Sequence, residues 1–284
     1  MVCENASQDE EYRAPIIGYH RAPLSQKFGA PRQPNLVALT SVIEMSSPYD
    51  TPAAFAGLDA FSHIWVTWQF HHNYIDKDKG LNKTNSSFRP QVRPPRLGGN
   101  QKIGVFASRS MYRPSALGLS VVKLERIEIV EGRVLLVISG ADMIDATPII
   151  DIKPYVPYSD AIAHAESGFA PAAPILLEVT MTELAHKQFM SLVNESVIHK
   201  EQDRKIHDKA KDKDTVAACI YKIQNQLLSS DVDVIKSLIA QDPRPAYRRH
   251  DTKTSFVMRY KAVDVSFQLT ELGDLQIRSV IEVG

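Results

Sequence analysis

The chain has 284 residues, a formal net charge of zero and 44% hydrophobic residues, values typical of a globular protein with one or two domains. The balanced charge disfavours a protein that coats DNA through its overall charge, so any contact with nucleic acid would depend on a local basic surface. The two cysteines, Cys3 and Cys219, are too few and too far apart for a disulfide framework or a zinc knuckle. The sequence has no apolar run of about 18 residues and starts with a polar, acidic stretch, so we expect a cytoplasmic protein without a membrane span.

Short segments of alternating apolar and polar residues dominate the first half of the chain. After a polar tail (1–13), we expect strands within 15–22, 35–45, 61–72, 103–108, 120–130 and 133–139, with a short helical or turn segment at 49–58. The last two strands are separated only by Glu131 and Gly132, which predicts a β-hairpin. Closely spaced short strands with little helical periodicity predict a closed or partly closed β-barrel or a β-sandwich. We expect a β-barrel domain at 14–166.

The pattern changes after a small-residue, proline-rich linker at 167–174. We expect a strand at 176–181, helices at 183–197, 216–228 and 231–241, and three final strands between 255 and 283. The charged run 199–214 is typical of a solvated loop or an exposed helix end. The chain as a whole is therefore predicted to be mainly β, with a barrel followed by a smaller α+β domain at 167–284.

A basic, acid-free window is the most unusual feature of the sequence. From Lys79 to Lys123 there are nine lysines and arginines and no aspartate or glutamate. Prolines and glycines between Arg93 and Ser120 fix some backbone angles and free others. A rigid cationic surface of this kind suits a phosphate-bearing ligand or an RNA backbone, although a solvated basic loop has the same composition.

Several common classes of site are absent from the sequence. No GxGxxG, GxxxxGK[ST] or GxSxG motif occurs, which disfavours a Rossmann dinucleotide site, a P-loop and an acyl-transfer nucleophile. His63, His71 and His72 are close in sequence, but we expect His71 and His72 to point to opposite faces of one strand. We therefore expect no metal site.

The remaining motifs form a constellation: PRQ at 31–33, FHHN at 70–73, RPPRLGGN at 93–100, FASRSMYRPSALGLS at 106–120, DMID at 142–145 and DPRPAYR at 242–248. In this order they resemble the TrmO family of tRNA adenosine N6-methyltransferases, whose catalytic domain is a β-barrel. The resemblance covers residues 15–165 closely, fades over 196–240 and returns at DPRPAYR.

The resemblance implies an S-adenosylmethionine-dependent homodimer that methylates N6 of threonylcarbamoyl-adenosine, next to the anticodon of threonine tRNA. Mapped motif by motif, the donor site of the family falls on the following residues: Pro31, Arg32, Gln33, His71, His72, Arg109, Val121, Asp142, Met143, Ile144 and Asp145. Relatives commonly carry glutamine where His72 stands here.

These residue types fit such a donor. Arg32 or Arg109 can bind its carboxylate through paired hydrogen bonds, and Asp142 and Asp145 can accept from its ammonium. Methyl transfer to a purine N6 is helped by a base that removes the proton, for which Asp145, His71 and Tyr155 are candidates.

For the RNA we expect phosphate contacts from arginines and stacking on aromatic side chains. The expected phosphate contacts are Arg93, Arg96, Arg113, Arg244 and Arg248, and the expected stacking residues are Tyr112 and Phe88. Core packing is an equally reasonable role for Tyr112. Two alternatives use the same surface: a non-catalytic RNA-binding barrel, and a methyltransferase of small molecules. We expect neither DNA nor a membrane as a partner.

Overall fold

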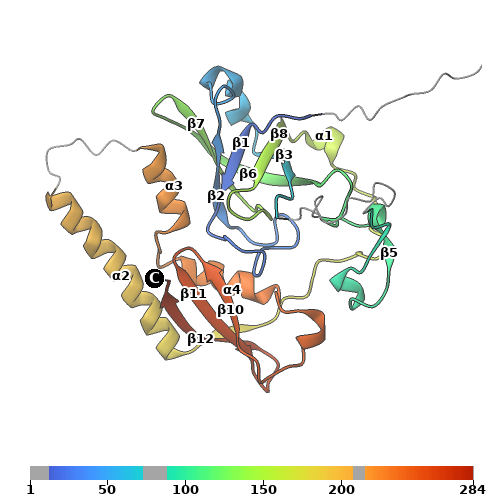
Figure 1. The fold of residues 1–284 in the computed structure, drawn as a ribbon, viewed down its shortest axis with the longest axis vertical. Helices are drawn as coiled ribbons and strands as arrows, with labels where there is room; N and C mark the ends of the chain where they lie inside the picture. Colours follow the sequence, from blue (N-terminus) through green and yellow to red (C-terminus); the bar gives the residue numbers. More distant parts are fainter. Residues whose placement is uncertain (1–12, 73–87, 207–214, 284) are drawn as a thin grey trace, which may run out of the picture.

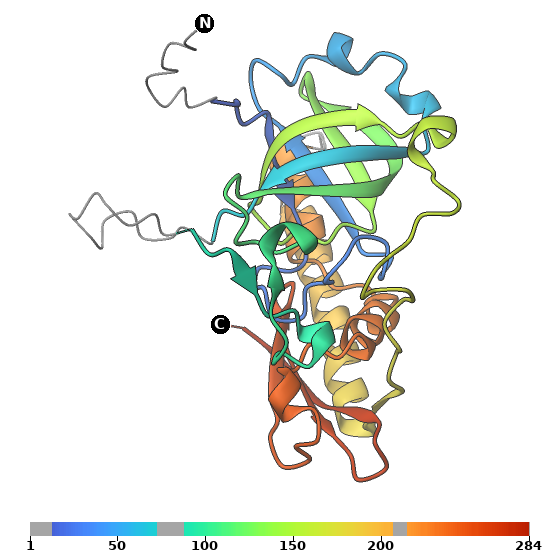
Figure 2. The ribbon, with the colours of Figure 1, turned by 90° about the vertical axis from the view of Figure 1, so that its right-hand side faces the viewer.

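The computed structural model describes residues 13–72, 88–206 and 215–283, and within α2 the side chains only up to residue 194. Residues 1–12, 73–87, 207–214 and 284 lie outside the described residues. The expected polar tail, Cys3 and the end of the expected charged run fall on these residues. The described chain folds into an upper β-barrel and a lower α+β unit, as Figures 1 and 2 show.

Six antiparallel strands form a closed barrel in the order β1-β2-β7-β6-β3-β8, which confirms the predicted fold class. Their bounds are β1 Gly18–Arg21, β2 Thr40–Met45, β3 His63–Gln69, β6 Leu117–Val130, β7 Arg133–Ser139 and β8 Pro148–Pro154. Along β3 the buried and half-buried residues alternate, as the sequence pattern predicted, because successive side chains point into and out of the barrel. Glu131 and Gly132, with φ of 54° and 79°, form the predicted tight turn between β6 and β7.

The described part of the segment between β3 and β6, residues 70–72 and 88–116, contains little regular structure. It consists of a two-stranded ribbon, β4 Gln91–Val92 and β5 Ile103–Gly104, and two 3₁₀-helices, η3 Pro95–Leu97 and η4 Val105–Ala107. The strand expected over 103–108 is therefore only two residues long, because the chain turns into η4 after Gly104. Figure 2 shows this segment beside the barrel, at the level of its junction with the lower unit.

Other short elements lie on the barrel rim and in the lower unit. Two 3₁₀-helices, η1 Pro52–Phe55 and η2 Leu58–Ala60, occupy the region predicted as helical or turn. A four-residue helix, α1 Pro157–Asp160, follows β8 and precedes the extended linker. A last 3₁₀-helix, η5 Ala246–Arg248, lies within the DPRPAYR motif.

The lower unit consists of one sheet and three helices. The sheet has the order β10-β11-β12-β9, with β9 parallel to β12. The bounds are β9 Val179–Met181, α2 Glu183–Ile206, α3 Val216–Gln224, α4 Asp231–Ala240, β10 Phe256–Tyr260, β11 Val263–Leu269 and β12 Leu275–Glu282. The helix α2 runs beyond the predicted position 197 to Ile206, so the first half of the charged run is helical.

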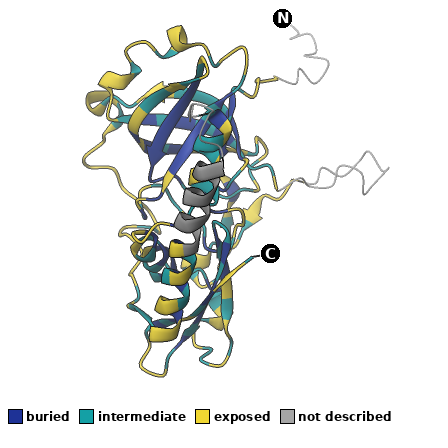
Figure 3. Ribbon diagram, turned by 90° about the vertical axis from the view of Figure 1, so that its left-hand side faces the viewer, coloured by how far each residue is buried: buried dark blue, intermediate teal, exposed yellow. Residues whose placement is uncertain are grey.

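Two large hydrophobic cores support the two units, and the segment between β1 and β2 contributes to the core of the lower unit. The barrel core includes Ile43, Val66 and Ile138, and its buried strands are dark blue in Figure 3. The core of the lower unit includes Leu24, Val37 and Leu39, which precede β2 in the sequence. Residues 22–39 therefore run from the barrel across the lower unit and back, which places the PRQ motif at the junction.

The described chain has no helix that is both long enough and apolar enough to cross a membrane.

Candidate functional site

The PRQ motif lies on the loop that joins the two units. Pro31 is buried. The side chains of Arg32 and Gln33 form hydrogen bonds with two different segments of the chain. Arg32 Nη2 donates to the carbonyl of Asp242 at 3.3 Å, in the DPRPAYR motif. Arg109 Nη1 donates to Gln33 Oε1 at 2.7 Å, from the FASRS motif. Consecutive residues of one loop thus connect three of the motifs that the sequence singled out.

Asn35 anchors this loop to the barrel. Its side-chain Nδ2 donates to the carbonyl of Val121 at 3.0 Å, and its backbone N–H donates to the carbonyl of Gly140 at 2.8 Å. Asn35 has a φ of 62°, a left-handed conformation that asparagine tolerates better than most residues. Val121, an expected donor-site residue, is therefore held next to the PRQ loop by a residue that the sequence analysis did not single out.

The DMID turn, 142–145, connects β7 to β8 beside this loop. Trp68 Nε1 donates to Ser120 Oγ at 2.9 Å, and Ser120 Oγ donates to Asp142 Oδ1 at 2.5 Å. Burial raises the pKa of Asp142 above its ordinary value, while the hydrogen bond from Ser120 and the charge of Arg109 act in the opposite direction. Met143 packs in the barrel core. The packing of Met143 in the core and the hydrogen bonds from Trp68 through Ser120 to Asp142 thus hold the turn in place.

The second half of the turn is held by N-terminal and C-terminal residues. Asp145 Oδ1 accepts from the backbone N–H of Ala22 at 2.9 Å and from Gln224 Nε2 at 2.7 Å, at the end of α3. The carbonyl of Ile144 accepts from His20 Nδ1 at 3.1 Å. Hydrogen bonds therefore orient both carboxylates of the turn.

His71 and His72 lie in a turn after β3, and the expectation that they point to opposite faces of a strand is wrong. The strand ends at Gln69, and the two imidazole rings lie side by side with centroids 4.1 Å apart. Burial lowers the pKa of His71 and His72 lowers it further, while nearby Asp145 raises it. Within the part of the chain that the structure describes, His71 Nε2 is buried without a hydrogen-bond partner.

Tyr155 does not belong to this cluster. Its ring packs against His63 and Trp65, with centroids 6.3 and 5.9 Å away, at the start of β3. His71 follows the other end of the same strand. Gln69 is six positions after His63, and six steps of about 3.3 Å along a strand span roughly 20 Å. Within one chain, Tyr155 therefore lies at the opposite end of β3 from His71.

The arginines of the basic window have different surroundings. Arg93 is exposed, and Arg96 Nη2 donates to the carbonyl of Ala172 in the linker. Arg113 Nη1 donates to the carbonyl of Ser108 at 2.7 Å, and its guanidinium lies over the ring of Phe106. Arg93 is thus the most accessible of the three for a phosphate.

Exposed aromatic side chains accompany these arginines. Phe106 is 68% exposed, and Phe88 lies 6.2 Å from it between ring centroids. The guanidinium of Arg89 lies 4.9 Å from the ring centroid of Tyr112, which is itself exposed. The structure therefore gives Tyr112 a surface position rather than a place in the core.

Arg244, one of the expected phosphate contacts, is buried. Its side chain is 1% exposed, and Nε donates to Asp242 Oδ1 at 2.7 Å. A guanidinium enclosed in this way does not reach an RNA backbone, so the expectation for Arg244 is wrong as stated. Arg248, in the same motif, is exposed and lies beside the ring of Tyr247.

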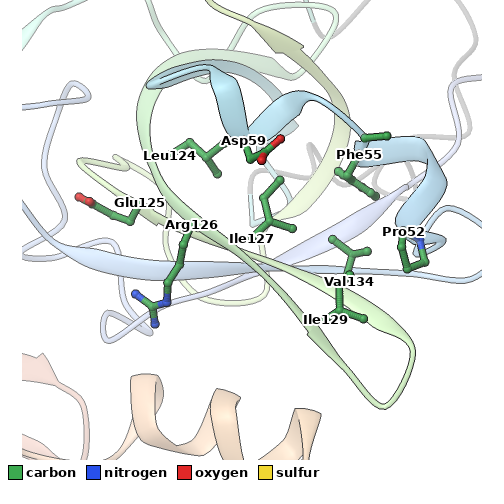
Figure 4. A pocket seen from close by; sticks show the side chains of 10 residues that line it. Pro52, Phe55, Asp59, Leu124, Glu125, Arg126, Ile127, Ile129 and Val134 are labelled. Atoms are coloured by element: carbon green, nitrogen blue, oxygen red, sulfur yellow. The ribbon is translucent and has the colours of Figure 1, made fainter.

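A hollow on the barrel lies away from these residues. It has a volume of about 480 Å³ and lies between the η1–η2 segment and the β6–β7 hairpin, as Figure 4 shows. Its lining includes Phe55, Ile127 and Val134, and none of the expected site residues. The candidate site is therefore defined by converging motifs rather than by this hollow. In the described parts of the chain, no group of three or more His, Cys, Asp or Glu side chains could hold a metal ion.

Comparison with known proteins agrees with this architecture. Residues 19–161 match the tRNA-methyltransferase O N-terminal domain, and residues 213–283 match the TrmO C-terminal domain. The protein named "Putative S-adenosylmethionine-dependent methyltransferase RcsF" of Pseudomonas aeruginosa is 37% identical over 88% of this chain and 89% of its own length. The tRNA (adenine(37)-N6)-methyltransferase of Escherichia coli is 33% identical over 90% of this chain and 93% of its own length.

A solved structure extends the likeness to the whole fold. The crystal structure of TrmO from Pseudomonas aeruginosa superposes with a TM-score of 0.65 at 27% identity, covering 97% of this chain and 99% of that one. The barrel and its motif cluster are thus those of a barrel-type methyltransferase, in which S-adenosylmethionine is the methyl donor. The chain belongs to the TrmO family.

Proposed function

We propose that this protein methylates N6 of threonylcarbamoyl-adenosine, next to the anticodon of threonine tRNA. As a TrmO-family member the chain is an S-adenosylmethionine-dependent tRNA adenine-N6 methyltransferase. One observation supports the finer proposal most strongly. The PRQ loop connects Arg109 on one side to the carbonyl of Asp242 on the other, so motifs of both units meet at one place.

The residues around the DMID turn suit the methyl donor. When bound, S-adenosylmethionine supplies an electrophilic methyl group. Arg109 is exposed beyond its bond to Gln33, so its remaining N–H groups are available to the donor carboxylate. Asp142 and Asp145 offer oxygens to the ammonium, and the main chain of 142–145 offers hydrogen-bonding groups to the adenine. The buried, unpartnered Nε2 of His71 among the described residues is a polar atom that a bound ligand would satisfy.

We assign the proton acceptor to His71. A lowered pKa keeps the imidazole neutral at pH 7, so it can accept a proton from the acceptor nitrogen as methylation proceeds. Asp145 is held by hydrogen bonds from Ala22 and Gln224, and its charge stabilises the imidazolium that forms. Positioning of donor and acceptor supplies most of the acceleration, because the displacement needs no covalent enzyme intermediate.

The basic window and the lower unit supply the RNA surface in this proposal. Arg93 and Arg248 contact backbone phosphates, with Arg96 and Arg113 at the edge of the same surface. The exposed rings of Phe88, Phe106 and Tyr112 stack on unpaired bases of the anticodon loop. The barrel, 14–166, binds the donor in this proposal, and the lower unit, 167–284, contacts the tRNA or supports a dimer.

We further propose that the protein acts as a homodimer in the cytoplasm, where its tRNA substrate is found. Leu119 and Phe106 are 56% and 68% exposed close to the donor motifs, and apolar side chains of this size favour a covered surface. Sedimentation equilibrium with and without S-adenosylmethionine tests the oligomeric state, and a monomer under both conditions contradicts the dimer.

One experiment tests the activity. The full chain is incubated with methyl-labelled S-adenosylmethionine and threonine tRNA that carries, or lacks, the threonylcarbamoyl group. We expect label in the modified tRNA only, and nucleoside mass spectrometry places the methyl group on N6. No transfer together with no calorimetric binding of the donor would leave only the non-catalytic RNA-binding alternative, and donor binding without affinity for tRNA would favour a small-molecule acceptor.

A further inference from the structure

Three arginines contact one residue, Asp242, where the two units meet. Asp242 accepts a forked pair of hydrogen bonds from Arg244, from Nε at 2.7 Å and from Nη2 at 3.3 Å. Arg249 Nε lies 3.6 Å from Oδ2 of the same carboxylate, and Arg32 Nη2 donates to the backbone carbonyl of Asp242. We call this group, Arg32, Asp242, Arg244 and Arg249, the arginine cluster.

The arginine cluster has more positive than negative charge. Three guanidinium groups and one carboxylate leave a formal charge of +2 within hydrogen-bonding range of one residue. Asp242 lies two residues after the end of α4, and the carboxyl end of a helix contributes only about −0.5 of a charge, so this end offsets only part of the formal excess. Partial burial of the guanidinium lowers the pKa of Arg32, although the rest of the side chain is exposed, and the neighbouring Arg249 lowers it further.

Two guanidinium nitrogens in the arginine cluster are also unsatisfied. Arg244 Nη1 and Arg249 Nε are buried and have no hydrogen-bond partner among the residues that the structure describes. Arg244 is only 1% exposed, so water cannot readily supply the missing bond. Buried polar atoms of folded proteins are nearly always paired, so the unpaired Nε of Arg249, a residue that is partly exposed, points to an anion that completes the arginine cluster.

The backbone around the arginine cluster is held in an unusual conformation. Asp242 has a φ of 49°, which non-glycine residues rarely adopt, and it lies directly before Pro243. Pro243 and Pro245 flank Arg244 and restrict the backbone on both sides. A strained and rigid segment of this kind is typical of a site whose geometry is set before the ligand binds.

We propose that the arginine cluster binds the carboxylate of the threonylcarbamoyl group on the acceptor adenosine. Arg32 is exposed and Arg249 is partly exposed, so these two contact the carboxylate, whereas the buried Arg244 is a positioning residue that fixes Asp242. The proposal rests on the proposed function, because it takes the modified adenosine as the acceptor.

The position of the arginine cluster relative to the donor motifs supports this assignment. In threonylcarbamoyl-adenosine the carboxyl carbon is four bonds from N6, so its binding site must lie close to the methyl donor. Arg32 and Gln33 are consecutive residues, with α-carbons about 3.8 Å apart. Arg32 reaches the arginine cluster and Gln33 reaches Arg109, so the two sites share one loop.

A planar carboxylate also fits the arginine cluster better than a backbone phosphate does. The guanidinium groups lie at a partly enclosed junction, whereas phosphates of a folded RNA stay on its outside and meet exposed side chains such as Arg93. A forked guanidinium matches the two oxygens of a carboxylate in one plane. The methyl donor also has a carboxylate. The experiment must therefore distinguish three anions: the threonylcarbamoyl carboxylate, the donor carboxylate and an RNA phosphate.

The test is a binding experiment with the full chain and S-adenosylhomocysteine, which cannot transfer a methyl group. Three anticodon stem-loop RNAs are compared: one with threonylcarbamoyl-adenosine, one with its carboxylate masked as a methyl ester, and one with unmodified adenosine. We expect the free acid to bind roughly tenfold more tightly than the ester, as for a charge-assisted pair. In Arg249→Gln and in Arg32→Gln this ratio should fall to about one. Arg278→Gln, which removes an exposed charge from β12, is the matched control and should keep the wild-type ratio.

Three results would overturn the proposal. An unchanged ratio of acid to ester in Arg249→Gln and Arg32→Gln means that the arginine cluster does not bind this carboxylate. An equal loss for all three RNAs assigns the arginine cluster to a phosphate, and a loss of S-adenosylhomocysteine affinity assigns it to the donor. The readout is binding, so it decides this proposal even if the wild type fails to methylate the modified RNA, a failure that contradicts the proposed function instead.

Discussion

Asn35 occupies the space that a side chain on Gly140 would need. A Cβ on Gly140 would lie 2.5 Å from Asn35 Oδ1, and Gly140 has a φ of 81°. The same pair is joined by a 2.8 Å hydrogen bond from the Asn35 N–H to the Gly140 carbonyl. The residue after β7 must therefore be glycine, because its φ is positive and because Asn35 leaves no room for a Cβ. Its hydrogen bond with Asn35 holds the PRQ loop against the barrel.

Replacement of this glycine separates the loop from the barrel. We expect Gly140→Ala to destabilise the protein by about 2–3 kcal/mol, from the strained φ and the clash together. It should also weaken S-adenosylmethionine binding, because Gln33 and Arg109 shift with the loop. Thermal unfolding and calorimetry measure the two effects.

A matched control tests whether the clash matters. Gly132 has a φ of 79°, but a Cβ there would meet no atom within 4 Å. Gly132→Ala should cost only about 1 kcal/mol and leave donor affinity unchanged. Equal effects from the two substitutions would show that the contact with Asn35 contributes nothing.

Local patterns made the barrel predictable from the sequence. Period-two alternation identified β3, and the Glu131-Gly132 turn identified the β6–β7 hairpin, because both signals depend on neighbours in the chain. The end of β3 was missed because aromatic residues continue the alternation beyond Gln69 into the histidine turn. The sequence of segment 22–39 did not predict that its side chains pack in the core of the lower unit, because this packing depends on residues far away in the chain.

The candidate site was less predictable than the fold. Motif letters identified Arg32, Gln33 and Arg109, but they did not reveal that Asn35 and Gln224 orient the site. Those contacts join residues far apart in the sequence, and no local pattern encodes them. Arg244 was misassigned for a related reason, since a charged residue is usually exposed unless a partner such as Asp242 neutralises it.

The Arg109–Gln33 pair leads to a prediction about the donor. We expect Arg109→Ala to weaken S-adenosylmethionine binding by about ten- to a hundredfold, the range for one charge-assisted hydrogen bond to a carboxylate. Arg126→Ala removes an arginine that pairs with Glu128 away from the motifs and should leave the affinity unchanged. Calorimetric titration with the donor measures both, and equal affinities in the two variants contradict the role given to Arg109.

The stability of the protein should fall in mild acid because of His20. Burial lowers the pKa of His20 to about 4, against 6.5 in the unfolded chain, so the folded state binds the proton less well. The stabilisation is full above pH 6.5 and is lost as the pH falls towards 4. Between pH 7 and 5 we expect a loss of about 2 kcal/mol by urea unfolding.

The variant His20→Gln isolates this contribution. A glutamine amide can still donate to the Ile144 carbonyl but does not titrate, so the pH dependence of unfolding between 5 and 6.5 should weaken. His71, whose pKa is also lowered, keeps a smaller dependence of the same sign. A slope identical to that of the wild type would show that His20 is protonated in the folded state.

The accessible arginine of the basic window leads to a prediction about RNA. We expect Arg93→Ala to weaken tRNA binding and to reduce the slope of log K against log salt by about 0.7–0.9, the value for one lost phosphate contact. Donor affinity should stay unchanged. Filter binding at several salt concentrations measures the slope, and a loss of donor affinity instead would show that Arg93 belongs to the donor site.

The choice between His71 and Tyr155 as proton acceptor can be decided by rate measurements. Tyr155 packs on His63 and Trp65 at the far end of β3, so Tyr155→Phe keeps the ring contacts and should leave the rate of methyl transfer within about twofold of the wild type. His71→Asn removes the base and should slow single-turnover transfer by about a hundredfold or more while donor affinity changes little. The wild-type rate should fall below the lowered pKa of His71, because the imidazolium cannot accept a proton, and this fall should disappear in His71→Asn. A rate that depends on Tyr155 but not on His71 would mean that the acceptor nitrogen approaches the barrel from the opposite end, where neither the DMID turn nor the PRQ loop could hold the donor.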